Sequence, residues 1–335
     1  MKNLIRMKSL KNMLILMIFV IFLILFTLGC SRMALSSSPS ADGKLIISTT
    51  LFPQYSFAKI IGGDLVEVQM IVPPGIESHS FEPTPRTITN LRNADLLLYT
   101  GQVMEPWMGD LIANLGDSKV EIMDLSEGIT LLTEADEHNS EEENHEETDV
   151  SGEEDLHGDF DPHYWLDPDN AIIMVEHIRD AMIQNDPSNA LHYSQNAETL
   201  IEDLGALDEA FVQYFSTVDH PKLVYGGHFA FGYFAAKYHV DYISPFTGFS
   251  PNAEPKPKQI TAIIDYIEAN SIKTVFYEEL LSPKIAQVIA EETGAKMLIL
   301  NGVHNVTQEQ IDDGETYISL MYQNLENLRL GLSEE

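Results

Sequence analysis

The sequence predicts an α/β protein made of two parallel-sheet lobes joined by a long, rigid connecting helix. Short, nearly all-apolar runs of β type alternate with helical patterns in both halves of the chain. Strands of this kind, separated by helices, are typical of parallel sheets that are covered on both faces. The roughly 300 residues that follow an N-terminal leader are also more than one hydrophobic core usually serves, which favours two domains.

The first lobe is expected over residues 44–188. Its predicted helices are residues 54–61 and 86–93. Its predicted strands are residues 45–49, 66–72, 95–100 and 120–124.

The middle of the chain interrupts this alternation. Two helical patterns, residues 171–184 and 190–215, follow one another without a strand, and Pro187 and Ser188 mark their junction. A helix over the second pattern would be about 39 Å long at 1.5 Å per residue. We therefore expect the connecting helix within residues 189–217.

The second lobe is expected over residues 218–332, where the alternation returns. Its predicted helices are residues 259–269 and 283–292. Its predicted strands are residues 223–226, 242–244, 274–277 and 297–300.

Residues 1–29 are organised like a signal peptide. A basic stretch precedes an apolar run over residues 13–28, which is shorter than the about 20 residues that cross a bilayer. The run ends at Cys30 and resembles a bacterial lipobox, although Thr27 stands where such boxes usually carry leucine. The resemblance implies cleavage before Cys30 and a lipid on its sulfur, with residues 30–43 as a serine-rich tether. An uncleaved membrane helix is the alternative, and both interpretations export the rest of the chain.

The charge of the chain excludes one class of partner. The net charge is −33, and removing residues 1–29, with their four positive charges and no negative ones, makes it −37. A surface this acidic repels nucleic acid and attracts cations. The single cysteine allows no internal disulfide, so the fold must be held together by burial.

Residues 134–161 fit no regular element. They contain fourteen Asp or Glu residues, no Lys or Arg, and the histidines His138, His145 and His157. Mutual repulsion and a lack of apolar residues predict a mobile loop, and a long loop inside a compact domain is often functional. The histidines favour an auxiliary role in gathering metal ions, and a merely solvated insertion is the alternative.

Four other histidines share one position in the predicted topology, because each follows the carboxyl end of a strand. They are His79 after strand 66–72, His163 after strand 120–124 and the acidic segment, His228 after strand 223–226, and His304 after strand 297–300. Ligands of parallel α/β sheets bind outside this edge, so two histidines from each lobe can reach one crevice. Each alone could be a capping or buried histidine, but four together indicate a metal site. Imidazole nitrogens in a closed tetrahedron suit Zn²⁺.

Six motifs spread over nearly the whole exported chain point to a family. They are Pro-Gly-Ile-Glu-Ser-His-Ser-Phe-Glu-Pro-Thr-Pro at 74–85, Asn-Ala-Asp-Leu at 93–96, Asp-Pro-His-Tyr-Trp-Leu-Asp-Pro at 161–168, His-Phe-Ala-Phe-Gly-Tyr-Phe at 228–234, Ser-Pro-Asn-Ala-Glu-Pro at 250–255, and Gly-Glu-Thr-Tyr-Ile-Ser-Leu-Met at 314–321. With these motifs, residues 44–330 resemble the cluster A-I (cluster IX) solute-binding proteins of ABC transporters, and within them the zinc-specific group.

The resemblance implies a ligand set. It implies that His79, His163 and His228 bind the metal and that the acidic segment corresponds to a loop that marks zinc members. Manganese members carry an aspartate at the position of Asn301, whereas some zinc members carry a glutamate at the position of His304. His304 is therefore expected as the fourth ligand, with Glu278 or a water as the alternative.

The resemblance also implies a function. The expected protein is a monomeric, lipid-anchored receptor on the outer face of the bacterial membrane, or in the periplasm if there is an outer membrane. It would capture Zn²⁺ between its lobes and deliver it to an ABC permease. A manganese receptor of the same family is the first alternative.

Two other classes of protein fit the sequence less well. A secreted zinc hydrolase needs an open coordination position and a general base, whereas four protein ligands close the site. The nearest match to a zinc-protease motif, at residues 145–149, has Asp149 where the second histidine belongs. An adhesin or structural surface protein is not supported by repeats or by aromatic surface patches. We therefore expect no enzyme activity.

Overall fold

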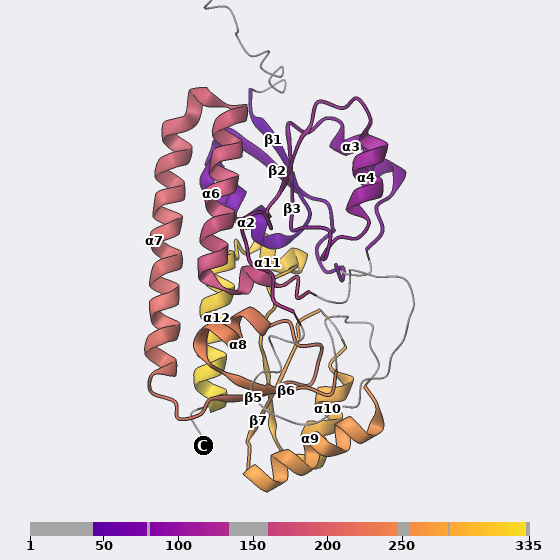
Figure 1. Ribbon diagram of the computed structural model, residues 1–335, viewed down its shortest axis with the longest axis vertical. Coiled ribbons are helices and arrows are strands. Elements are labelled where there is room, and N and C mark those ends of the chain that lie inside the picture. Colours follow the sequence, from indigo (N-terminus) through magenta and orange to yellow (C-terminus); the bar gives the residue numbers. More distant parts are fainter. Residues whose placement is uncertain (1–42, 79–80, 134–159, 247–254, 281, 333–335) are drawn as a thin grey trace, which may run out of the picture. The chain divides into compact units, whose positions relative to one another are not determined.

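The computed structural model describes residues 43–78, 81–133, 160–246, 255–280 and 282–332 (Figure 1). Three groups of predicted functional residues are affected by the gaps. Cys30, His79 and residues 134–159 of the acidic segment, with His138, His145 and His157, lie outside the described residues.

The first half of the chain forms a four-stranded parallel sheet in the order β2-β1-β3-β4. The strands are β1 (Leu45–Thr49), β2 (Val66–Met70), β3 (Leu96–Tyr99) and β4 (Glu121–Asp124). The helices between them are α2 (Phe52–Gly62), α3 (Pro85–Leu91) and α4 (Met108–Leu115).

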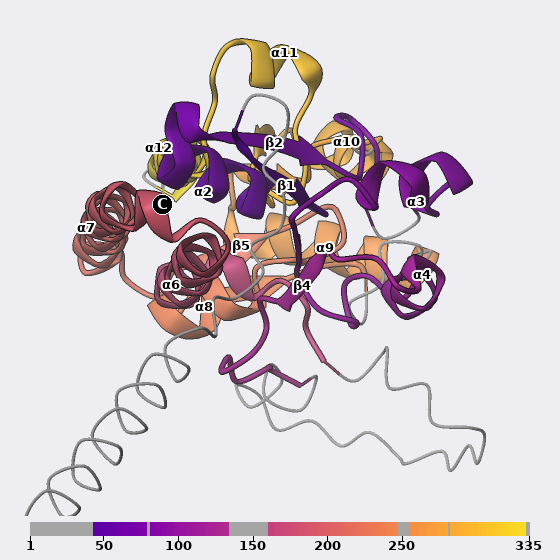
Figure 2. The ribbon, with the colours of Figure 1, turned by 90° about the horizontal axis from the view of Figure 1, so that it is seen from above.

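Strand β3 shows why this sheet needs helices on both faces. All four of its residues are buried, and successive side chains point to opposite faces. Leu96 and Leu98 pack into the main core with α2 and α6 (Pro168–Asn185), whereas Leu97 and Tyr99 join a second cluster with residues of α3 and α4. Figure 2 shows these two pairs of helices on opposite sides of the sheet. The all-apolar strand thus makes the covered parallel sheet that the sequence predicted.

The second half contains two short parallel pairs of strands. They are β5 (Lys222–Val224) with β6 (Asp241–Ile243), and β7 (Thr274–Tyr277) with β8 (Lys296–Ile299). A parallel bridge between Tyr225 and Phe276 connects the pairs, and Gly226 N donates to Phe276 O at 2.8 Å. A Cβ on Gly226 would lie 2.6 Å from the Cα of Ala286, so a side chain here would push α10 away. The helices are α8 (Gly232–Tyr238), α9 (Pro257–Asn270) and α10 (Lys284–Thr293).

Two long helices stand between these halves in the sequence. Helix α6 (Pro168–Asn185) is followed by its C-cap residue Asp186, and α7 (Ala190–Phe215) starts after a single 3-10 turn. The Asp186 carboxylate fixes that turn by accepting from Asn189 Nδ2 at 2.6 Å and from Tyr193 Oη at 2.8 Å. The bounds of α7 coincide with the predicted helical pattern, and the predicted fold class is confirmed.

The C-terminal helices were not predicted as elements. They are α11 (Gln308–Asp312) and α12 (Tyr317–Leu332), and α12 contacts α2, α7, β7 and β8. The largest hydrophobic cluster consequently runs without interruption from Ile47 of the first sheet to Phe276 of the second half. An ion-pair group adds to this connection, because Lys237 Nζ of α8 lies 2.9 Å from Asp167 Oδ1 and 3.3 Å from Asp208 Oδ1.

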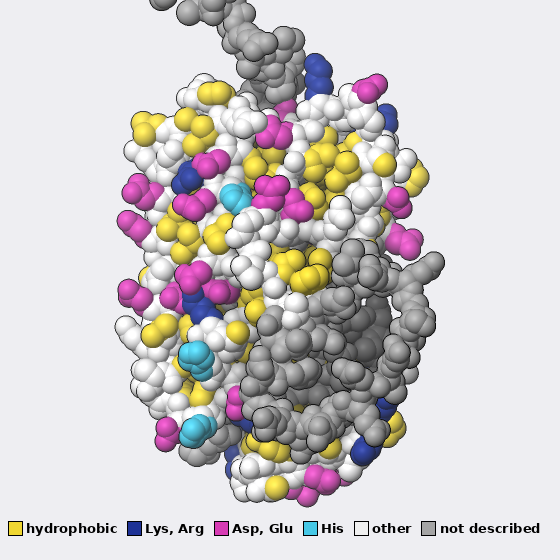
Figure 3. All heavy atoms as spheres, in the orientation of Figure 1, with side chains coloured by type: hydrophobic (Ala, Val, Ile, Leu, Met, Phe, Trp, Pro, Cys, Tyr) yellow, Lys and Arg dark blue, Asp and Glu magenta, His cyan; other side chains and the backbone are white. Residues whose placement is uncertain are grey.

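The described surface agrees with the acidic composition. Exposed acids of α6 include Glu176 and Asp180, and Figure 3 shows acidic side chains spread over the face formed by α6 and α7. Within the described residues, no helix has both the length and the apolar character needed to cross a membrane.

Candidate metal centre

The structure buries the three described histidines of the predicted site. His163, His228 and His304 are all at most 1% exposed. The rings of His163 and His228 lie 5.0 Å apart between centroids, although 65 residues of chain separate them. His228 and His304 follow the carboxyl ends of β5 and β8 within a few residues, whereas a long segment separates His163 from the end of β4.

His163 is held by its own turn. The carboxylate of Asp161 accepts from both the backbone N of His163, at 2.9 Å, and its Nδ1, at 2.7 Å. The Asp161 carbonyl in turn accepts from Tyr233 Oη of α8 at 2.9 Å. These bonds fix the ring, and they leave Nε2 as its lone-pair nitrogen when the proton is on Nδ1.

His304 lies in a turn that the rest of the protein holds firmly. Val303 has a φ of +57°, and its N donates to Asn301 Oδ1 at 2.7 Å. Asn324 of α12 bonds both backbone groups of Asn301, at 2.7 and 2.8 Å. Trp165, two residues after His163, donates from Nε1 to Gly302 O at 2.8 Å. Asn301 is therefore used to shape the turn, and the indole of Trp165 ties the His163 and His304 segments together.

The loop that leads to His79 is attached to the same turn. Asn305 Nδ2 donates to Pro73 O at 2.9 Å and to Ile76 O at 2.6 Å. Ser78, the last described residue before His79, is 1% exposed. The residue that precedes the undescribed pair 79–80 is therefore buried, and the loop before it is bonded to the residue that follows His304.

Two glutamates at the end of β7 face the histidines. Glu278 Oε2 lies 3.8 Å from His228 Nδ1, and Glu279 Oε1 lies 3.6 Å from His304 Nδ1. Both distances exceed a hydrogen bond, and neither of these two oxygens accepts a hydrogen bond from a described residue. The other oxygen of Glu279 accepts from Gly302 N at 2.8 Å.

Sequence reasoning named Glu278 but missed Glu279 and Asp161. Glu279 stands one residue further along the same strand end, and Asp161 stands two residues before His163. The rule that selected the histidines, position at the carboxyl edge of a strand, would also have selected Glu279.

Burial sets the charge states of these groups. Burial, together with the neighbouring His228 and His304, lowers the pKa of His163 well below 6.5. Burial raises the pKa of Asp161 to about 7, against a hydrogen bond from the His163 backbone. Burial also raises the pKa of Glu279 to about 7, and the nearby His304 opposes that shift. The imidazole of His163 is therefore neutral at physiological pH, which is the form that binds a metal ion.

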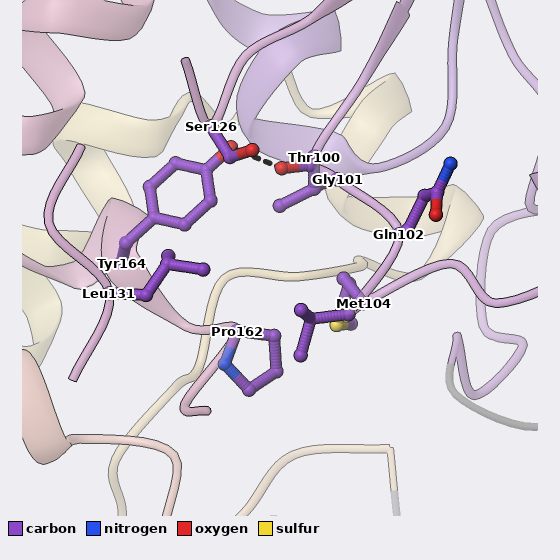
Figure 4. A pocket seen from close by; sticks show the side chains of 9 residues that line it. Thr100, Gly101, Gln102, Met104, Ser126, Leu131, Pro162 and Tyr164 are labelled. Atoms are coloured by element: carbon purple, nitrogen blue, oxygen red, sulfur yellow. Dashed lines mark hydrogen bonds between the residues drawn. The ribbon is translucent and has the colours of Figure 1, made fainter. Parts of the chain in front are cut away.

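The described side chains alone do not complete a metal site. Within the described ranges, no three His, Cys, Asp or Glu side chains come together in an arrangement that could hold a metal ion. A small pocket beside this region, with about 220 Å³ of empty space including open solvent, is lined by residues such as Met104, Leu131 and Pro162 (Figure 4). Tyr164 Oη donates to Thr100 O there at 2.6 Å. Its lining has no histidine or carboxylate, so it is not the metal centre.

Residues 47–331 match the family model described as zinc-uptake complex component A, periplasmic. The chain belongs to this family. It is 34% identical over 316 residues to the zinc-binding lipoprotein AdcA of Streptococcus pneumoniae, covering 93% of this chain and 59% of that protein. The chain thus spans little more than half of that relative. It is 32% identical over 306 residues to the high-affinity zinc uptake system protein ZnuA of Bacillus subtilis, covering 91% and 93% of the two chains.

Solved structures agree on the fold. The Zn(II)-bound ZnuA-like domain of Streptococcus pneumoniae AdcA superposes with a TM-score of 0.71 at 31% identity, covering 87% of this chain and all of that one. The laminin-binding protein Lmb of Streptococcus agalactiae, described as bifunctional with adhesin and metal-transporting activity, superposes with a TM-score of 0.71 at 29% identity, covering 86% and 99%.

Proposed function

We propose that this chain is the extracytoplasmic receptor of an ABC-type importer, and that it captures Zn²⁺ between two lobes for delivery to a membrane permease. The observation that carries the proposal is the group of buried histidines His163, His228 and His304, which come from three distant segments. Membership of the zinc-uptake family supports it, as do the names of the AdcA and ZnuA relatives.

The proposed ligands are the imidazoles of His79, His163, His228 and His304. Zn²⁺ accepts four such nitrogens at about 2.0–2.1 Å in a tetrahedron, and Mn²⁺ prefers oxygen ligands. The firm hydrogen bonding of the Asn301–His304 turn supports His304 as the fourth ligand, because an ordered ligand loses little entropy on binding. The hydrogen bonds of Asn305 to the loop before His79 support His79 as the remaining ligand.

A closed shell of four protein ligands favours binding over catalysis. A catalytic zinc keeps one position for water, and the proposed ligand set leaves none. The proposed division is a first lobe over residues 44–188, a connecting helix within 189–217 and a second lobe over 218–332. The contacts of α12 with α2 and α7 support a stiff connection, in which the lobes move little on loading.

The proposal extends to regions outside the described residues. Cleavage after residue 29 and a lipid on Cys30 would anchor a monomeric receptor to the outer face of the membrane, within reach of the permease. His138, His145 and His157 would gather zinc weakly on the acidic segment. The net charge of −33 supports cation attraction.

A competition titration tests the proposed metal. We expect the purified protein, stripped of metal, to bind one Zn²⁺ tightly and to release bound Mn²⁺ when equal Zn²⁺ is added, because imidazole nitrogen suits zinc better. Stoichiometric metal analysis by mass spectrometry measures both ions together. Manganese binding that equals or exceeds zinc binding would assign the chain to manganese uptake.

A further inference from the structure

Each of the three described histidines of the predicted site presents the same ring nitrogen to a buried carboxylate. His163 Nδ1 lies 2.7 Å from Asp161, His304 Nδ1 lies 3.6 Å from Glu279, and His228 Nδ1 lies 3.8 Å from Glu278. All three carboxylates belong to residues that are at most 9% exposed. The same pairing of Nδ1 with a carboxylate thus occurs on three histidine segments, as a hydrogen bond at His163 and at longer range at His228 and His304.

The chemistry of imidazole explains this pairing. A carboxylate beside Nδ1 favours the tautomer with its proton on Nδ1, and the lone pair then stands on Nε2. A histidine bound to a metal commonly donates its other N–H to a carboxylate, which fixes the ring and makes the ligand more basic. The Asp161–His163 pair already has the distance of a formed hydrogen bond.

The two glutamates lie next to different histidines. They are adjacent at the end of β7, yet Glu278 approaches His228, which follows β5, while Glu279 approaches His304, which follows β8. Glu279 is fixed by Gly302 N on Oε2, so that Oε1 is the atom near the imidazole. Gly302 also makes room, because a Cβ there would lie 3.0 Å from His304 Nδ1.

We propose that Glu278 and Glu279 are positioning residues, which hold His228 and His304 as Nδ1–H tautomers with Nε2 directed to zinc, and that neither glutamate is a ligand. Each faces the Nδ1 side of its imidazole, and a metal on Nε2 lies at the opposite side of the ring. This inference rests on the proposed zinc-binding function. It excludes Glu278 as the alternative fourth ligand, and it gives Glu279 a role that the sequence did not suggest.

Nitrogen NMR of the zinc-loaded wild-type protein tests the tautomers without any substitution. Long-range ¹H–¹⁵N spectra of protein labelled at histidine distinguish a metal-bound nitrogen from a protonated one. We expect His228 and His304 each to show zinc on Nε2 and a proton on Nδ1. Zinc on Nδ1, or a His304 without bound metal, overturns the proposal. If the wild-type protein binds no stoichiometric zinc, the proposed zinc-receptor function itself is wrong. The failure of the positioning role and the failure of the proposed function therefore give different results.

Matched substitutions test the glutamates. We expect Glu279→Gln and Glu278→Gln each to lower zinc affinity by about 10–100-fold, the loss that follows when the hydrogen-bond partner behind a metal-binding histidine is removed. Zinc should still bind one to one through four imidazoles. Glu105→Gln is the control, because Glu105 is equally buried but bonds hydroxyl and backbone groups only, and its zinc affinity should stay within about twofold. Affinity unchanged in both variants, or the loss of one ligand from the bound zinc in either, overturns the positioning role.

Discussion

Two glutamates of this protein are both buried and both have a raised pKa, but they differ in how their carboxylate oxygens are hydrogen bonded. Glu105 and Glu279 are 1% and 9% exposed, and burial raises the pKa of each to about 7. Glu105 accepts from Thr50 Oγ1 at 2.5 Å, from Thr100 N at 3.2 Å and from Gly101 N at 3.0 Å. Glu279 uses Oε2 for Gly302, while Oε1 faces an imidazole at 3.6 Å.

The difference shows that burial and a raised pKa do not by themselves mark a functional carboxylate. Structural networks perturb a pKa as strongly as binding sites do. Both oxygens of Glu105 accept hydrogen bonds, which is what a purely structural group requires. Glu279 keeps one oxygen next to a histidine that follows another strand, so it can respond to what that histidine binds. Three predictions test this distinction and the site around it.

The largest expected effect belongs to His228. Structural zinc sites bind with about 10–16 kcal/mol, so one of four ligands contributes about 2.5–4 kcal/mol, and His228→Ala should lower zinc affinity by roughly 70–900-fold. His304→Ala should cost less, about 10–100-fold, since water can enter its position. Calorimetry with a competing chelator measures both, with Glu105→Gln as control. Affinity that is unchanged in His304→Ala would reduce the site to three histidines.

The second prediction concerns pH and belongs to Glu105. Its pKa is 4.5 in a free chain and about 7 when folded, so between these values the folded state holds the extra proton. Stability from this group is therefore fully present below pH 4.5 and is lost as pH rises to about 7, by at most about 3 kcal/mol.

Glu105→Gln removes this titration. Urea unfolding of the metal-free wild type and variant, compared from about pH 5 to about pH 8, should show the wild type losing stability relative to the variant. Other groups titrate equally in both proteins and cancel. Parallel pH profiles would mean that the network holds Glu105 ionised throughout, against our account of its burial.

The smallest expected effect comes from the acidic segment. Thr133 and Phe160 form an antiparallel bridge, and Asp161 N donates to Leu132 O at 2.8 Å, so the two ends of the segment are already adjacent. Deleting residues 134–158 and joining the ends with a short glycine linker should leave the tight zinc affinity within about threefold. Weaker additional zinc binding should disappear. Loss of the tight site would mean that the segment supplies a primary ligand.

The sequence predicted what periodic patterns encode. Helix α7 could be predicted from the sequence because its buried residues recur every three or four positions, from Tyr193 and Ala197 through Leu200 to Phe215. Strands β3 and β7 could be predicted because their residues are buried almost throughout, on both faces of their sheets. The edge rule selected His163, His228 and His304, which the structure buries, with the rings of the first two 5.0 Å apart between centroids.

Contacts between distant segments could not be predicted in the same way. Trp165 bonds Gly302 across 137 residues, and Tyr233 bonds the Asp161 segment across 72. Such bonds depend on how the sheets pack, and no local pattern of residues predicts them. The pairing of Glu279 with His304 is of this kind, because the sequence alone does not show which of two adjacent glutamates lies next to which histidine.

A crystal structure of the zinc-loaded protein, with anomalous diffraction measured at the zinc edge, tests the central claim most directly. The account predicts one strong peak with the Nε2 atoms of His79, His163, His228 and His304 at about 2.0–2.1 Å. It also predicts Asp161, Glu278 and Glu279 behind their imidazoles, away from the metal. A peak bound by Glu278 or Glu279, or by fewer than three of these histidines, would contradict the account.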